Sequence, residues 1–113
     1  MSRINRVTTK SGDKGKTSLA PGLRVDKSDF SIGALGSVDE LSAFLGLLRT
    51  ELIQKEEETE IEQIQQVTFE IGAIISTSGS YSSAKTVRGV AALEETIQNL
   101  NDSLEPLKEF VVP

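Results

Sequence analysis

SVDELSAFLGLL (residues 37–48) is the stretch that decides the fold class of this 113-residue chain. Ser37 and Glu40 form the pattern S-x-x-E, in which each side chain can bind the other residue's backbone N–H at a helix start. Apolar residues then follow at helical spacing, at Leu41, Phe44, Leu45, Leu48 and Leu52. The pattern predicts an amphipathic helix that begins near Ser37.

Two further helices are expected downstream. A second capping box, Thr59-x-x-Glu62, opens a helix whose apolar stripe is Ile61, Ile64, Thr68, Ile71 and Ile75. The acidic run 56–58 before it is interpreted as solvated. The small, polar residues 76–89 indicate a loop, and a third helix runs from Val90 or Ala91 to Leu104. Pro106 stops it. The predicted fold class is all-α, an up-down bundle of about three helices.

The first 36 residues lack helical periodicity and are rich in Gly, Ser, Thr and Lys. Met1–Thr9 is expected to be a short extended arm, and Ala20-Pro21-Gly22 is a turn signal. Irregular segments of this length in compact domains tend to be functional or disordered.

One part of this segment, TKSGDKGKTS (residues 9–18), suits a polyphosphate. Its glycines allow close backbone approach, its lysines supply positive charge, and its hydroxyls supply hydrogen bonds or a metal contact. Gly15-Lys16-Thr17 resembles the end of a Walker A motif, but Lys10 stands where that motif needs its first glycine. A solvent-exposed turn is the alternative interpretation of the same residues.

Composition narrows the chemistry. The chain has no Cys and no His, which excludes thiolate nucleophiles, Ser-His triads and the commonest metal ligand. Residues 1–27 carry seven basic and two acidic side chains, and the remainder carries five basic and fifteen acidic ones. This asymmetry indicates a local anion site rather than a nucleic-acid surface, for which aromatic residues are also too few. No signal peptide and no stretch of transmembrane length is expected, so the predicted location is cytoplasmic, without a membrane partner.

Three motifs at fixed spacing resemble one family. They are Thr9–Thr17, then Lys27 fifteen residues after Gly12, then Gly36-Ser37-Val38-Asp39-Glu40-Leu41. Together they resemble the N-terminal part of the ATP:cob(I)alamin adenosyltransferases of the trimeric, propanediol-utilisation type. Residues 104–113 are similar to a later motif of the same family.

The resemblance implies a five-helix bundle assembled as a homotrimer, with active sites between subunits. The implied reaction moves the 5′-deoxyadenosyl group of ATP to the cobalt of cob(I)alamin and releases triphosphate. The implied cofactors and partners are ATP, Mg²⁺, cobalamin, further copies of the chain and a flavoprotein reductase. Because Co(I) is the nucleophile, the protein needs neither His nor Cys for attack.

The resemblance also assigns residues. It places a set of loop residues around ATP: Thr9, Lys10, Ser11, Gly12, Gly15, Thr17 and Ser18. Lys27 would hold a phosphate, and the Thr17 hydroxyl would face phosphate oxygens or Mg²⁺. Two catalytic residues are implied. Asp39 would pair with an arginine across the subunit interface, and Phe110 would lie beside the corrin. From the residues alone, Asp39 compensates a helix dipole and Phe110 belongs to a core.

The expected organisation is one adenosyltransferase-like domain over 1–113, with a nucleotide-binding loop at 1–36 and helices at 37–113. The family's arginine-rich helix has no counterpart up to Pro113. The chain is therefore expected to be incomplete at its C-terminus and inactive alone. Two alternatives stay open, a non-catalytic nucleotide-binding or regulatory helical module and a helical interaction domain with an unstructured basic arm.

Overall fold

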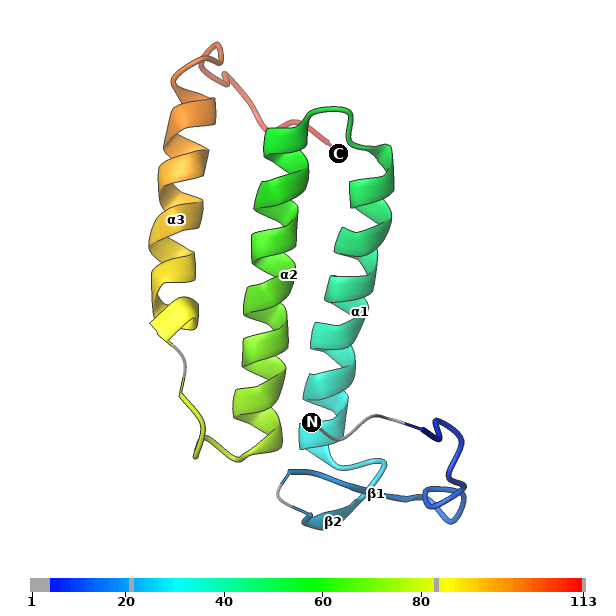
Figure 1. Cartoon of the computed structure of the whole chain (residues 1–113). Coiled ribbons are helices and arrows are strands. Elements are labelled where there is room, and N and C mark those ends of the chain that lie inside the picture. Colours follow the sequence, from blue (N-terminus) through cyan, green and yellow to red (C-terminus); the bar gives the residue numbers. More distant parts are fainter. Residues whose placement is uncertain (1–4, 21, 83, 113) are drawn as a thin grey trace. The chain divides into compact units, whose positions relative to one another are not determined.

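The computed structural model describes residues 5–20, 22–82 and 84–112. Its elements are β1 (Lys16–Ser18), β2 (Arg24–Asp26), α1 (Phe30–Glu51), α2 (Lys55–Ser76) and α3 (Ala84–Asn101) (Figure 1). This confirms the helical fold class and adds a two-stranded sheet. Residues 1–4 of the expected arm, Pro21 of the expected turn and the terminal Pro113 lie outside the described residues. The chain divides into two units, 1–82 and 83–113, which are treated separately.

The two strands form a small antiparallel hairpin in which Lys16 pairs with Asp26, Thr17 with Val25 and Ser18 with Arg24. The expected turn between them is confirmed where it is described, since the N–H of Leu19 donates to Leu23 O at 2.8 Å. Residues 5–9 contain no strand, so the expectation of an extended β arm there is wrong. An arm without a hydrogen-bonded neighbour gains nothing from β propensity alone.

α1 begins at Phe30, one and a half to two turns earlier than expected. Asp29 is the N-cap, and its carboxylate accepts hydrogen bonds from the Ser31 hydroxyl and from Ser31 N at 2.9 Å. These bonds, the hydroxyl first, lower the pKa of Asp29. The predicted capping box is wrong because Ser37 lies inside the helix and donates to Gly33 O at 3.1 Å. Glu40 is an exposed mid-helix residue.

The other helix starts also lie earlier than predicted. α2 begins at Lys55, and Thr59 donates to Lys55 O at 2.9 Å, so the second capping box is wrong as well. The acidic run 56–58 forms the first turn of α2 instead of preceding it. α3 begins at Ala84, which shortens the predicted loop, and it ends at Asn101, before Leu104. In α2 the strong helix formers Lys55 and the acidic run 56–58 extend the helix ahead of the internal T-x-x-E pattern. In α1 the Asp29 cap sets the start, in spite of Gly33 and Gly36 in the first two turns.

α1 and α2 are joined by residues 52–54 and pack antiparallel. Gln65 Nε2 donates to Ser42 O at 2.9 Å, and a side chain on Gly72 would lie 3.7 Å from Leu35. Gly46 also lies against Gln65, whose amide would be 3.2 Å from an added Cβ. Residues early in α1 therefore meet residues late in α2, which places the start of α1 and the end of α2 together at the hairpin end (Figure 1).

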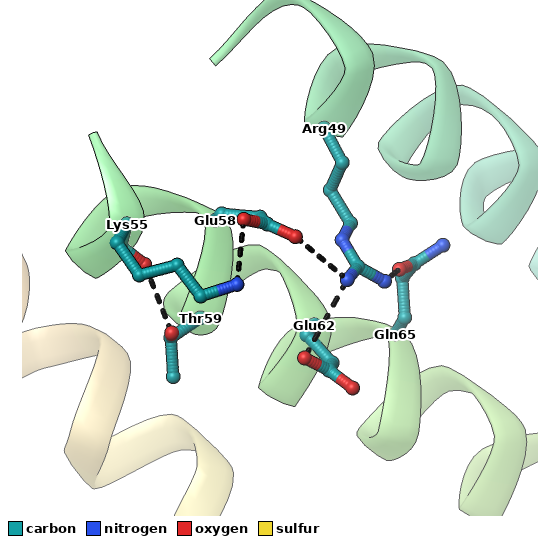
Figure 2. Close-up of polar contacts among 6 residues, drawn as sticks. All are labelled: Arg49, Lys55, Glu58, Thr59, Glu62 and Gln65. Atoms are coloured by element: carbon teal, nitrogen blue, oxygen red, sulfur yellow. Dashed lines mark hydrogen bonds and ion pairs between the residues drawn. The ribbon is translucent and has the colours of Figure 1, made fainter. Parts of the chain in front are cut away.

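A polar cluster joins the two helices at the opposite end (Figure 2). The Arg49 guanidinium donates to Gln65 Oε1 at 3.0 Å, to Glu58 Oε1 at 3.3 Å and to Glu62 Oε2 at 3.5 Å. Lys55 Nζ lies 2.8 Å from the other oxygen of Glu58. The Arg49 side chain is 29% exposed and that of Glu58 is 32% exposed, so these contacts are partly screened from water. The expectation that the acidic run is solvated is therefore wrong for Glu58, which is paired with Arg49 and Lys55.

Burial within the first unit is incomplete. The predicted α2 stripe is confirmed, because Thr68 is buried and Ile61, Ile64, Ile71 and Ile75 are half-buried. Of the α1 stripe, only Leu45 and Leu52 are half-buried; Phe44 is 64% exposed, and Leu41 and Leu48 are also exposed. Among the described residues only Leu19 and Thr68 are buried, and each keeps a few per cent of its surface exposed.

α1 is apolar on more than one face. By length and composition it is the one helix of the described residues that could cross a membrane, which corrects the expectation that no stretch approaches that length. A core helix of a helical bundle meets the same two criteria. The two cases differ in what covers the apolar side chains, and α2 covers one face of α1 through the contacts above.

The Arg49 cluster yields a stability prediction. We expect Arg49→Met to lower the midpoint of thermal unfolding by about 5 °C, because partly buried acceptors lose a charged donor. Lys55→Met is the matched control: Lys55 contacts the same Glu58 but is 77% exposed, so a smaller shift is expected. Circular dichroism during heating measures both. Equal shifts would show that the cluster does not hold the helices together.

The same cluster predicts a pH dependence. Hydrogen bonds from Lys55 first and then Arg49 hold the pKa of Glu58 below its ordinary value of 4.5. A carboxylate whose pKa is lowered by folding adds stability above its unfolded pKa, and that stability is lost as pH falls through the folded pKa. Glu58→Gln should therefore destabilise the protein at pH 7, with the difference shrinking below pH 4.5. Glu57→Gln, at an exposed position, should show no such convergence.

Candidate anion-binding site

The glycine-rich loop forms two successive turns. The N–H of Asp13 donates to Lys10 O at 3.3 Å, and that of Gly15 donates to Gly12 O at 3.2 Å. Gly15 has φ +83°, which glycine adopts without strain. Lys10 has φ 61°, a left-handed conformation that is uncommon for a residue with a side chain. The chain thus reverses sharply twice between Lys10 and Gly15.

Lys27 lies against this loop. Its backbone N–H donates to Gly15 O at 2.9 Å. A Cβ placed on Gly12 would lie 3.0 Å from Lys27 Cε, 3.1 Å from its Nζ and 3.2 Å from Lys16 O. The missing side chain of Gly12 therefore makes room for the Lys27 ammonium. The fixed spacing between these two residues has a direct geometric reason.

The positive charge of this unit is only partly neutralised. Lys16 Nζ pairs with Asp26 Oδ1 at 3.0 Å across the hairpin. Within the described part of the chain, Lys10, Lys14 and Lys27 form no ion pair. All three side chains are exposed. An anion at the loop would meet these charges without first displacing a carboxylate.

The predicted hydroxyls do not all lie together. The Thr9 and Ser11 hydroxyls are hydrogen-bonded at 2.9 Å at the start of the loop. Ser18 is exposed and shares one face of the hairpin with Lys16, whereas Thr17 is half-buried on the other, because alternate strand residues point to opposite faces. The structure thus separates Thr17 from Ser18. Leu19, the buried apolar residue of the hairpin, follows Thr17 by two residues and so points to the same face.

Arg24 is a site residue that sequence reasoning missed. Its Nη1 donates to Ser18 Oγ at 3.2 Å, and its Nη2 donates to Ser11 O at 3.1 Å and to Lys16 O at 3.4 Å. The sequence showed it only as one basic residue among seven. Its closeness to Lys27, three residues later in the chain, was the one available signal.

Asp39 lies away from the helix N-terminus, because α1 begins at Phe30. The dipole-compensation interpretation of Asp39 is therefore wrong. Instead, Asp39 lines a cavity of about 250 Å³ between α1 and α2, together with Leu35, Val38, Ser42, Thr68, Phe69, Gly72, Ala73 and Ser76. Ser76 Oγ also accepts a hydrogen bond from Ala20 N at 3.1 Å. One serine thus connects the wall of the cavity to the hairpin.

Phe110 lies in the second unit, in an irregular segment after α3. Its side chain is fully exposed, and Val111 and Val112 are exposed as well. The core interpretation of Phe110 is therefore wrong for the residues described. Its expected position beside a corrin stays a prediction.

The fold and the site thus define a helical unit with a basic glycine loop at one end, and this loop lacks the first glycine of a Walker motif. Residues 7–113 match the family described as cobalamin adenosyltransferase. The chain therefore belongs to the cobalamin adenosyltransferase family.

Individual relatives agree. The chain is 36% identical over 112 residues to a cobalamin adenosyltransferase of Cupriavidus metallidurans, covering 98% of this chain and 60% of the relative. It is 37% identical over 112 residues to a corrinoid adenosyltransferase of Citrobacter freundii, covering 96% of this chain and 64% of the relative. The chain thus spans less than two thirds of the length of these relatives.

A solved structure supports the fold. A variant of the PduO-type ATP:corrinoid adenosyltransferase from Lactobacillus reuteri, complexed with cobalamin and ATP, matches with a TM-score of 0.82 at 29% identity. The match covers 96% of this chain and 63% of that chain. The resemblance found in the sequence motifs is confirmed at the level of family and fold.

Proposed function

We propose that this chain forms the ATP-binding part of a corrinoid adenosyltransferase that makes adenosylcobalamin. The observation that carries the proposal is the Lys27 ammonium held over Gly12, beside a loop whose positive charge is only partly neutralised. A triphosphate is a leaving group with several negative charges, so fixed cations near it stabilise the transition state as that charge develops. Relatives with this family's name and the complex with cobalamin and ATP support the choice of substrates.

In the proposed reaction, the lone pair of Co(I) attacks C5′ of ATP and forms the Co–C bond. The C5′–O bond breaks, and its electron pair leaves with the triphosphate. The nucleophile belongs to the substrate, which fits a chain without His or Cys. What remains for the protein is to hold C5′ in line with cobalt and to neutralise the leaving group.

Mg²⁺ is proposed to arrive with ATP. Among the described residues there is no cluster of three or more Asp, Glu, His or Cys side chains that could hold a resident metal. Mg²⁺ at nucleotide sites is commonly held by phosphate oxygens, waters and one or two protein oxygens. A single hydroxyl is compatible with that donor set, and Thr17 is the residue proposed to supply it.

We propose that Asp39 and Phe110 act with residues from another copy of the chain in a homotrimer. In this view Asp39 pairs with an arginine at the subunit interface, where its place on the wall of the α1–α2 cavity gives access to an incoming side chain. Exposed apolar residues on α1, including Leu41, Phe44 and Leu47, are consistent with further helices or subunits that cover them. Phe110 is proposed to contact the corrin.

The cytoplasm is the proposed location, and a flavoprotein reductase is the proposed source of electrons. Co(I) has to be generated by reduction before it can attack, and the described residues hold no redox cofactor site that the sequence motifs indicate. The reductase would therefore be a separate protein. A flavin is suited to this role because it delivers electrons one at a time.

Activity is tested with the protein at its natural full length, mixed with ATP, Mg²⁺ and chemically reduced cobalamin. Formation of adenosylcobalamin is followed by its absorbance.

We expect Lys27→Ala to raise the Kd for ATP about tenfold, through loss of a charge-assisted contact. Lys108→Ala, which removes an exposed lysine of the second unit, should leave the Kd unchanged. Calorimetry with ATP and with cobalamin separately completes the test. ATP binding without product or cobalamin binding would support a non-catalytic nucleotide-binding module instead.

Gly12 gives a second prediction for the same site. A methyl group at this position would lie 3.1 Å from Lys27 Nζ, so Gly12→Ala should push the ammonium aside and weaken ATP binding about as much as Lys27→Ala. The double variant should be no weaker than either single one, since both remove the same contact. Gly33→Ala is the control, because a Cβ there meets nothing within 4 Å. Full additivity of the two loop changes would contradict the proposed contact.

A further inference from the structure

The guanidinium of Arg24 connects both ends of the glycine loop. Ser11 lies within the first turn and Lys16 follows the second, and Nη2 donates to the backbone oxygens of both residues, at 3.1 and 3.4 Å. Nη1 adds a bond to Ser18 Oγ, on the residue directly opposite Arg24 in the hairpin. One planar group therefore closes the neck of the loop that spans residues 12–15.

Asp26 at the end of β2 and Lys27 directly after it add two more contacts, to the loop and to Lys16 beside it. Lys27 N–H donates to Gly15 O at 2.9 Å, and Asp26 pairs with Lys16 at 3.0 Å. The segment 10–15, which includes this loop, has Lys10 in an uncommon conformation and two tight turns. A segment of this kind needs outside contacts to keep a single shape.

We infer that Arg24 is a positioning residue that shapes the loop for its anion without being the anion's principal ligand. This inference rests on the proposed function of the loop as a triphosphate site. Three of the five N–H donors that a guanidinium offers are used by acceptors within the protein. The Lys27 ammonium, by contrast, forms no ion pair among the described residues and stays available to the ligand.

Arg24 also has an electrostatic effect on the loop. The backbone oxygens of Ser11 and Lys16 carry partial negative charge and would repel a phosphate. By binding both, the guanidinium directs them toward itself and offsets their charge. A lysine cannot reproduce this, because an ammonium is a point charge and lacks the planar fork that reaches separate acceptors at once.

The test compares Arg24→Met and Arg24→Lys with the parent chain in two measurements. Amide hydrogen exchange of residues 11–18 is followed without nucleotide, and Kd values are measured for ATP and for inorganic triphosphate. We expect exchange of the loop amides to become about fivefold faster in both variants, and both Kd values to rise about tenfold. Ser18→Ala, which removes one acceptor of Arg24, should show the same changes at smaller size. Arg6→Met is the matched control, because Arg6 contacts only the neighbouring Thr8 O, at 3.2 Å, and it should change neither quantity.

The outcomes separate the inference from the proposed function. Unchanged loop exchange in Arg24→Met would overturn it, as would full recovery of both quantities in Arg24→Lys, since charge alone would then suffice. Faster exchange with unchanged Kd values would also overturn it. If the parent chain binds neither ATP nor triphosphate, the proposed function fails, while the exchange data still decide whether Arg24 fastens the loop. Far-UV circular dichroism verifies that the helices are intact in every variant.

Discussion

The antiparallel contact between α1 and α2 determines where every other part of the first unit lies. Residues early in α1 meet residues late in α2. The β1–β2 hairpin, which precedes α1 in the chain, therefore lies where the start of α1 and the end of α2 meet. The bond from Ala20 N to Ser76 Oγ fastens it there. The cavity that contains Asp39 shares Ser76 with this contact. A shift of one helix along the other would therefore disturb the loop, the cavity and the Asp39 environment together.

The two ends of this helix pair are stabilised by different forces. At the far end, Arg49 makes charged hydrogen bonds to three α2 side chains, which fix the register through geometry. Along the middle, apolar contact is incomplete, and Leu41, Phe44 and Leu47 on α1 remain exposed. A helix that is apolar on more than one face is normally covered on more than one face. Polar contacts specify how α1 and α2 align, whereas in the proposed trimer further helices or subunits would cover the rest of α1.

Sequence reasoning predicted the number and class of helices and the α2 stripe, because apolar periodicity is a strong signal over twenty residues. It failed at helix starts. Ser37-x-x-Glu40 and Thr59-x-x-Glu62 satisfy the capping pattern, yet both lie inside helices, where their hydroxyls donate to backbone oxygens four residues earlier. Asp29 caps α1 through Ser31, a pattern that looks no different in sequence from an ordinary turn. For the site, the spacing of Gly12 and Lys27 was noted only as part of a family resemblance, and the structure brings these two residues together. Arg24 could not be found, since its acceptors are mostly backbone oxygens, which every residue has.

The contrast between Lys27 and Arg24 explains why a loop of so many lysines still needs an arginine. An ammonium at the end of a flexible stem can follow a phosphate as it leaves, but it cannot hold several backbone groups in a fixed arrangement. A guanidinium can hold several backbone groups, but once its donors are occupied it is poorly suited to following a leaving phosphate. In the proposed reaction the protein supplies no nucleophile, so its contribution is mainly positional and electrostatic. The rigid shape of the loop is then as important as its charge, because a leaving triphosphate is stabilised only by groups that are already in place when the C5′–O bond breaks.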